Sequence, residues 1–240
     1  YEIEGKALNI MVRGEVPPFE IDKINEVNES IRGKFRYIEL RDEKVREKII
    51  FRSNITRYIR EYFYLRNYNE IETPILIKST PEGARDFIVP TRNYRGKFYA
   101  LPQSPQLMKQ ILMGSGFEKY YQIARCFRDE DLRADRQPEF SQLDVERAFV
   151  EESEIYSEIE NMFAYTAGKM GFDIKIPFPQ LSYDEVMGKY ASDKPDMRNP
   201  LVIEDHTEQF SVLPIDVDQK AVKEKEKIRG IKIPICLSGS

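Results

Sequence analysis

The sequence predicts an α+β fold in which an antiparallel β-sheet is flanked by helices. Two runs of alternating apolar and polar residues, 121–127 and 141–145, are typical of strands, and the charged loop between them indicates a hairpin. Two other stretches, 41–68 and 151–171, have apolar residues at helical spacing and predict long amphipathic helices. With 240 residues, the chain is long enough to bury a substantial core.

Composition and charge limit the classes of function. Acidic residues outnumber basic ones by 41 to 37, and a net charge of −4 does not indicate a general affinity for nucleic acid. Contact with RNA would have to use a local basic patch, and the candidates in the hairpin are Arg125, Arg128, Arg133 and Arg136.

The two cysteines, Cys126 and Cys236, form no CxxC pair and no disulfide framework. No apolar run is long enough to cross a bilayer and the N-terminus lacks a signal-peptide pattern, so we expect a cytoplasmic protein without membrane contact.

The N-terminal part of the chain combines an extended segment, a helix and a strand. Residues 1–21 alternate like a strand until the run VPPF interrupts them, which indicates the last strand and exit linker of a preceding domain. In the helix predicted at 41–68, the core-facing residues are Val45, Ile49, Ile55, Ile59, Tyr62 and Phe63. The next strand alternates at Ile71, Thr73 and Ile75, and Pro74 removes a backbone donor, so we expect an edge or interface strand.

A helix with a clear start signal precedes the hairpin. Ser104 is a favourable N-cap and Pro105 a favourable first helical residue. The stripe that we expect to be buried consists of Leu107, Met108, Ile111 and Leu112. Gln106 and Lys109 then lie on another face near the positive end of the helix, where they could bind an anion; the alternative is a solvated lysine.

The hairpin carries the most specific chemistry. Because side chains alternate across a strand, Gln122, Ala124, Cys126 and Arg128 share one face, and on the returning strand Phe140, Gln142, Asp144 and Glu146 do so. If the strands pair, an arginine fork lies beside carboxylates and an amide, which together can hold a zwitterion and a phosphate. The alternative is that the charged tip of the hairpin is only solvated.

The C-terminal part contains a second packing helix and a charged tail. In the helix predicted at 151–171, Gly171 is the expected cap, and the inner face consists of Ile155, Ile159, Phe163 and Met170. His206 is interpreted as an ordinary structural histidine. Residues 221–230 are interpreted as a charged helix or tether with a solvated face.

Several stretches of the sequence resemble a known family. The run FRDEDLRADRQPEFSQLD at 127–144 resembles motif 2 of the class II aminoacyl-tRNA synthetases, in the form found in bacterial-type aspartyl enzymes. STPEGARDF at 79–87 and QSPQLMK at 103–109 are similar to the same enzymes, and the helix and strand ending at Pro74 are similar to motif 1. The resemblance covers residues 33–210, most of the chain.

The resemblance implies an aspartate–tRNA ligase with the class II catalytic fold. Such an enzyme uses ATP and Mg²⁺ to convert L-aspartate to aspartyl-adenylate and then transfers the aspartyl group to the 3′ end of tRNA. It implies Arg128 as the catalytic residue, no protein metal ligand, and a homodimer formed through the motif 1 region. The implied aspartate-binding residues are Glu82, Gln106, Lys109, Arg128 and Asp144. The implied ATP-binding residues are Arg128, Asp129, Glu130 and Gln137.

The same resemblance predicts a division into three parts. Residues 1–22 would be the end of an upstream anticodon-binding OB-fold domain and its linker, and residues 23–205 the catalytic domain with motifs 1 and 2. Residues 206–240 would be the start or remnant of the insertion domain of bacterial-type enzymes. Motif 3, which supplies a second arginine for ATP, is not found in the 240 residues, so we expect this stretch alone to be inactive.

Other functions remain possible at this level of analysis. A related ligase of the asparaginyl or lysyl type is disfavoured by RADRQPEF and QSPQLMK. An aspartate–tRNA ligase that also charges the asparagine tRNA is an alternative with the same chemistry. A catalytically incomplete, synthetase-like fragment that binds RNA or a partner is an alternative of a different class.

Overall fold

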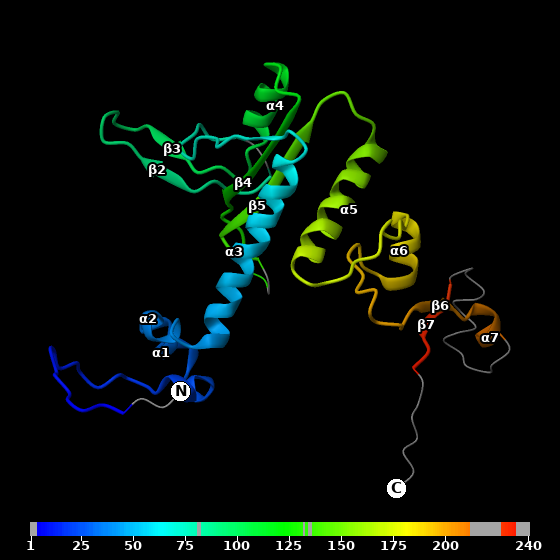
Figure 1. Ribbon diagram of the computed structural model, residues 1–240. Coiled ribbons are helices and arrows are strands. Elements are labelled where there is room, and N and C mark those ends of the chain that lie inside the picture. Colours follow the sequence, from blue (N-terminus) through cyan, green and yellow to red (C-terminus); the bar gives the residue numbers. More distant parts are fainter. Residues whose placement is uncertain (1–3, 81–82, 132, 134–135, 212–226, 234–240) are drawn as a thin grey trace, which may run out of the picture. The chain divides into compact units, whose positions relative to one another are not determined.

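The computed structural model describes residues 4–80, 83–131, 133, 136–211 and 227–233. The chain divides into two compact units, Tyr1–Pro177 and Phe178–Ser240 (Figure 1). The first unit contains the hairpin and the long helices, and the second contains short elements. Each unit is described by itself below, and the predicted domain limits at residues 22 and 205 stay predictions.

The predicted hairpin is present and forms most of the central sheet. Strand β4 (Lys119–Phe127) pairs antiparallel with β5 (Glu139–Arg147) over their full lengths, with Gln122 opposite Asp144. The short strand β1 (Asn69–Glu70) adds to the other edge of β4 in parallel, so the order is β1-β4-β5. Strands β2 (Ile88–Pro90) and β3 (Phe98–Ala100) form a separate antiparallel pair.

The two long helices begin and end at recognisable signals. Helix α3 (Glu43–Tyr64) starts after Asp42, whose carboxylate accepts a hydrogen bond from the backbone N–H of Val45 at 2.9 Å. Helix α5 (Glu152–Lys169) starts with a capping box formed by Glu151 and Glu154. It is followed by Gly171, whose φ of +83° confirms the predicted glycine at the C-terminal end.

The core lies between these helices and one face of the sheet (Figure 1). Its buried members are Tyr62, Phe63, Tyr68, Tyr121 and Met162. The ring of Phe63 stacks on Tyr121 at 4.9 Å and meets Tyr68 edge-on at 5.0 Å, measured between centroids. Tyr121 belongs to β4, and Leu143 and Val145 of β5 also pack here, so the odd-numbered strand residues face the helices. The even-numbered residues therefore face away from this core.

Some residues predicted to be buried are exposed. On helix α4 (Gln106–Gly114), Leu107 is 49% and Ile111 62% exposed, and on α5 Phe163 is 47% exposed. Ile49 of α3 is also exposed. These parts of the prediction were wrong because helical spacing identifies an apolar side without showing how much of it is covered. In α4, the side that meets the sheet carries Lys109.

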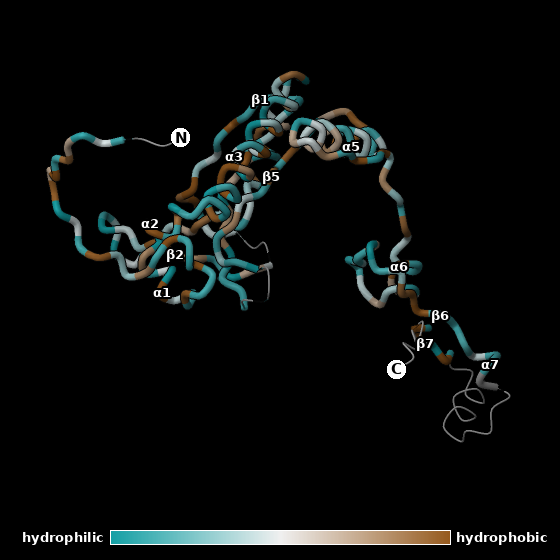
Figure 2. The backbone as a smooth tube through the Cα atoms, turned by 60° about the horizontal axis from the view of Figure 1, so that its bottom comes forward, coloured by the Kyte–Doolittle hydropathy of each residue, from teal (hydrophilic) through white to brown (hydrophobic). Residues whose placement is uncertain are grey.

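Two predicted strands differ from the structure. Residues 4–20 contain no strand, although hydrophobic and hydrophilic residues alternate along them (Figure 2). No strand among the described residues pairs with them, and a 3₁₀ helix (Ile21–Glu26) and helices α1 (Glu29–Lys34) and α2 (Arg36–Glu39) follow. The strand expected at 71–75 is found at Asn69–Glu70 instead, and its pairing ends where the N–H of Ile71 donates to the carbonyl of Tyr121. It is an edge strand, as predicted.

The second unit contains helix α6 (Tyr183–Tyr190), strand β6 (Ile203–Asp205), helix α7 (Thr207–Ser211) and strand β7 (Arg229–Ile231). Strands β6 and β7 pair antiparallel. The backbone N–H of His206 donates to the carbonyl of Ile228, and its ring lies against Gly230, in agreement with a structural role. Of the predicted charged segment 221–230, residues 221–226 lie outside the described residues. In neither unit does a described helix have the length and apolar character required to span a membrane.

We expect Phe63→Ala to lower the free energy of unfolding by about 3–5 kcal/mol, because it removes the ring at the centre of the aromatic cluster. Urea unfolding followed by circular dichroism measures the change. The neighbouring Tyr64 is 76% exposed and provides the control, since Tyr64→Ala should change the same quantity by less than about 0.5 kcal/mol. Equal losses in both variants would contradict the position of the core.

Candidate active site

The polar face of the hairpin brings together the residues that the alternation predicted. Gln122 lies opposite Asp144, Ala124 opposite Gln142, and Cys126 opposite Phe140. Directly opposite residues in an antiparallel pair point to the same side of the sheet. The predicted common face is therefore confirmed, and it lies on the side away from the aromatic core.

Arg128 is positioned by three backbone hydrogen bonds in succession. The N–H of Phe127 donates to the carbonyl of Pro102 at 2.9 Å, that of Arg128 to Pro138 at 2.9 Å, and that of Asp129 to Arg85 at 3.0 Å. Three different segments thus fix the backbone on which this arginine stands. Its guanidinium lies 5.1 Å from the ring centroid of Phe140, on the polar face. No ion pair joins it to a carboxylate of the described residues, so its planar donors remain available for an oxyanion.

Lys109 of α4 reaches the same face. Its Nζ atom lies 2.9 Å from Oδ1 of Asp144 and 3.2 Å from Oε2 of Glu146. Asp144 is buried, and its second oxygen, Oδ2, is buried too and has no hydrogen-bond partner among the described residues. A buried carboxylate oxygen without a donor is costly, which is typical of a site that a ligand completes.

The charges in this cluster shift one another's pKa values. Burial raises the pKa of the Asp144 carboxyl above its ordinary value, although Lys109 acts in the opposite direction. For Lys109, burial is the largest single influence and lowers the pKa, but Asp144 and Glu146 together outweigh it and raise the pKa. The net rise in its pKa keeps Lys109 charged, so a cation lies in a largely buried site between two acidic side chains.

Sequence reasoning missed a buried hydrogen-bond network on the same face of the sheet as these charged residues. The hydroxyl of the fully buried Tyr120 donates to Oε1 of Gln122 at 2.8 Å, and the hydroxyl of Thr73 donates to the same atom at 3.1 Å. Strand alternation already places Tyr120 on the face of Gln122, and this signal could have identified it. Thr73 could not be found in this way because it comes from a segment 49 residues away in the chain.

Comparison with known proteins agrees with this geometry. The family model for class II tRNA synthetases (D, K and N) matches residues 28–219. The chain belongs to this family. The predicted class II catalytic fold is thereby confirmed as well.

Relatives of this class II synthetase chain carry aspartate-specific names. The aspartate–tRNA(Asp/Asn) ligase of Thermoanaerobacter pseudethanolicus is 48% identical over 97% of the chain, which covers 39% of that protein. The aspartate–tRNA ligase of Thermosipho melanesiensis is 46% identical over 99% of the chain, which covers 40% of it. The chain thus spans about two fifths of the length of these curated relatives. A crystal structure of asparaginyl-tRNA synthetase from Pyrococcus horikoshii, complexed with asparaginyl-adenylate, shares the fold with a TM-score of 0.62 and 24% sequence identity. The matched region covers 72% of this chain and 43% of the chain in that crystal structure.

Two predicted residues of the site are not among the contacts described above. Gln106 is exposed at the first turn of α4, which starts one residue later than predicted, with Pro105 in the capping position. The hydroxyl of Ser104 still accepts a hydrogen bond from the backbone N–H of Gln106, at 3.3 Å. Glu82 lies outside the described residues.

The predicted ATP residues lie along the hairpin tip. Asp129 and Glu130 line a hollow of about 460 Å³ beside Arg128, together with Arg85, Arg133 and Arg136. Glu130 pairs with Arg136 at 3.4 Å, and Gln137 is exposed on the same loop. Several arginines around an open hollow fit a polyphosphate. The described residues contain no group of three or more potential metal ligands.

We expect Lys109→Met to raise the pKa of Asp144 further, because the substitution removes the charge that lowers it and leaves burial and Glu146, which raise it. Carboxyl ¹³C NMR titration measures this pKa. The carboxyl of Asp196, whose pKa Arg198 lowers to about 2, serves as an internal control and should not change.

A folded pKa above the unfolded one means that the contribution of Asp144 to stability is present at low pH and is lost as the pH rises through that pKa. An unchanged pKa for Asp144 would show that Lys109 is not its partner in solution.

Proposed function

We propose that the protein to which this chain belongs is an aspartate–tRNA ligase. It activates L-aspartate with ATP to aspartyl-adenylate and pyrophosphate, and then transfers the aspartyl group to the 3′ end of tRNA. The observation that carries the proposal is the common sheet face on which Arg128, Asp144 and the Lys109 ammonium lie together. The names of the relatives add support, since both forms specify aspartate as the amino acid. The alternative of a non-catalytic, synthetase-like protein has no observation in its favour.

The charged cluster fits aspartate at both of its ends. An ammonium has three donors, and Lys109 uses two of them for Asp144 and Glu146, which leaves the third for the side-chain carboxylate of the substrate. Oδ2 of Asp144 can accept a hydrogen bond from the substrate's α-ammonium. Glu82 and Gln106 complete the proposed set of aspartate-binding residues. Asparagine would offer the third donor of Lys109 a neutral amide oxygen in place of a carboxylate, which disfavours it.

The adenylation step needs alignment and charge neutralisation more than a protein nucleophile. An oxygen of the aspartate α-carboxylate attacks the α-phosphorus of ATP, the bond to the bridging oxygen breaks, and pyrophosphate leaves. Arg128 can fork onto the carboxylate and the α-phosphate, which repel each other, and hold them together. Asp129, Glu130 and Gln137 are the further residues proposed to contact ATP. Mg²⁺ bound to the ATP phosphates would neutralise additional negative charge.

The transfer step takes place between the adenylate and tRNA. A hydroxyl of the terminal ribose attacks the carbonyl carbon of the aspartyl group, and AMP leaves with the electron pair of the broken bond. The exposed arginines at the hairpin tip, Arg133 and Arg136, are suited to contact the phosphates of the acceptor end. A cytoplasmic location is part of the same proposal, as are the end of an upstream anticodon-binding domain with its linker at 1–22 and the start or remnant of an insertion domain at 206–240.

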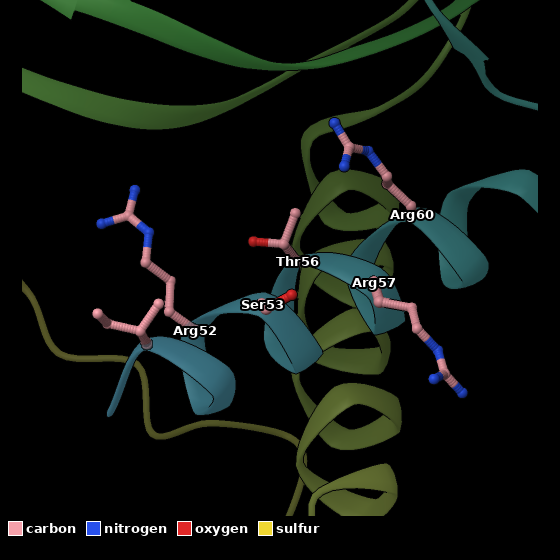
Figure 3. A pocket seen from close by; sticks show the side chains of 6 residues that line it. Arg52, Ser53, Thr56, Arg57 and Arg60 are labelled. Carbon is pink, nitrogen blue, oxygen red and sulfur yellow. The ribbon is translucent and has the colours of Figure 1, made fainter. Parts of the chain in front are cut away.

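A homodimer formed through α3 and the segment ending at Pro74 also belongs to this proposal. Figure 3 shows a hollow of about 450 Å³ along α3, where Arg52 and Arg60 reach toward the sheet. Arg52 donates to Ser141 at 2.9 Å and Arg60 to Glu70 at 2.9 Å. Ile49 lines this hollow and is 50% exposed, and Ile50, the next residue of α3, is 49% exposed. Apolar side chains beside paired arginines are suited to a second copy of the chain.

Aspartate-dependent ATP–pyrophosphate exchange by the full-length protein tests the proposed activity. In this assay we expect Arg128→Ala to lower the rate by at least ~10²-fold, because it removes one well-placed electrostatic donor. Arg125→Ala is the matched control: Arg125 lies on the opposite face of β4, paired with Glu139 at 3.0 Å, and its loss should leave the rate nearly unchanged. A near-normal rate for Arg128→Ala would remove this residue from the catalytic step.

Lys109→Leu should raise the KM for aspartate far more than the KM for ATP, because the substrate's side-chain carboxylate would lose its counterion. The same exchange assay, with each substrate varied in turn, measures both constants. Lys119→Leu is a suitable control, since the Lys119 ammonium donates to the carbonyl of Arg66, away from the polar face. Similar increases in both KM values for Lys109→Leu would argue against the assignment.

A further inference from the structure

Gln103 is a buried polar residue that the proposed function has not yet used. Only 1% of it is exposed, and it stands between the carbonyl of Pro102 and the start of α4. A primary amide transferred from water to the protein interior is costly unless its donors and acceptor are paired. The hydrogen bonds of the Gln103 side chain therefore indicate which neighbouring segments it holds in place.

The side chain of Gln103 binds one short segment from both sides. Its Nε2 donates to the carbonyl of Ala84 at 2.9 Å, and its Oε1 accepts from the N–H of Ala84 at 3.1 Å. Nε2 also donates to Oδ1 of Asp86, and the hydroxyl of Ser79 donates to Oδ2 of the same carboxylate. The amide thus pairs with the Ala84 backbone as a neighbouring strand would.

The segment held in this way supports the backbone of the catalytic arginine. The carbonyl of Arg85, between Ala84 and Asp86, accepts the N–H of Asp129 at 3.0 Å. On the other side, the carbonyl of Pro102, adjacent to Gln103, accepts the N–H of Phe127 at 2.9 Å. Gln103 therefore connects the two backbone acceptors that flank Arg128 in the hairpin.

We propose that Gln103 is a positioning residue that sets the backbone of Arg128 through Ala84, Arg85 and Asp129. The inference rests on the proposed function, because the residue that it positions is the proposed catalytic one. Gln103 also comes three residues before Gln106, the first residue of α4, the helix that carries Lys109. One side chain thus connects the aspartate side of the site to the ATP side. A displacement of reacting groups by about 1 Å can cost 10²-fold in rate, so such a connection has a catalytic consequence.

Amide hydrogen exchange tests the connection without any assay of activity. In Gln103→Met, which keeps the length of the side chain and removes its polar atoms, the amides of Ala84 and Asp129 should exchange at least ~10-fold faster. The amide of Leu143, in the middle of the β4–β5 ladder, should be unchanged. Gln110→Met makes the same replacement on the exposed side of α4 and should change none of the three. Unaltered exchange at Asp129 in Gln103→Met would overturn the proposal.

Kinetics then separate a positioning role from a purely structural one. In the full-length protein, Gln103→Met should lower kcat/KM for aspartate in ATP–pyrophosphate exchange by at least ~10-fold relative to Gln110→Met, measured at a temperature at which circular dichroism shows both variants to be fully folded. A loss of kcat/KM that only follows the fraction of unfolded protein would overturn the proposal. If the unaltered protein shows no aspartate-dependent exchange, the proposed function fails, while hydrogen exchange still decides on Gln103.

A donor–acceptor swap provides a second test. Gln103→Glu removes the donor and places a carboxylate against Asp86, so it should reduce kcat/KM at least as much as Gln103→Met does. Adding Asp86→Asn restores a donor between the two side chains, and only the carbonyl of Ala84 then lacks its side-chain partner. The double variant should regain part of the lost kcat/KM and part of the slow exchange at Asp129. Absence of recovery in both measurements would contradict the role of the Gln103–Asp86 contact.

Discussion

The β4–β5 ladder is the constraint on which the rest of the structure depends. Because side chains alternate along a strand, one register decides two surfaces at once. The odd-numbered side presents Tyr121, Leu143 and Val145 to the aromatic core. The even-numbered side presents Gln122 and Asp144 to the proposed active site. A shift of one residue in either strand would bury carboxylates in the core and expose aromatic rings in the site, so core packing also enforces the geometry of the site.

The cluster around Lys109 is energetically unfavourable before a substrate arrives. A charged pair in a half-buried place loses hydration, and here one cation faces two carboxylates, one of which has an oxygen without a donor. Replacement by apolar residues would remove these costs but also the recognition of a charged amino acid. The ammonium of aspartate would satisfy Asp144, and its side-chain carboxylate would balance Lys109. The folded protein thus carries part of the cost of substrate binding in advance, as preorganised sites do.

The sequence was sufficient for the parts of the fold that depend on local periodicity. Alternation predicted the hairpin and its common face, and helical spacing predicted α3 and α5, because strand and helix periods are properties of short stretches. The positions of candidate site residues on or next to these elements, such as Arg128 and Asp144, could be predicted in the same way. Periodicity did not predict burial correctly where burial depends on which other segments cover a helix. Leu107 and Ile111 have the spacing of a buried stripe but are exposed, and α4 contacts the sheet through Lys109. Residues 4–20 alternate like a strand but have no strand beside them.

The contacts that sequence reasoning missed are the long-range ones between polar groups. Thr73 meets Gln122 and Gln103 meets Ala84 across loops, and no period in the sequence records such pairings. Both contacts use a side-chain amide: that of Gln122 accepts from the hydroxyl of Thr73, and that of Gln103 binds the backbone of Ala84. Irregular segments cannot satisfy their own backbone groups as a ladder does, so they need such side chains to have a fixed position. The hairpin and α4 supply the charged groups of the proposed site, and buried amides fix the loops around them, which is the physical basis for a positioning role of a glutamine that does not contact substrate.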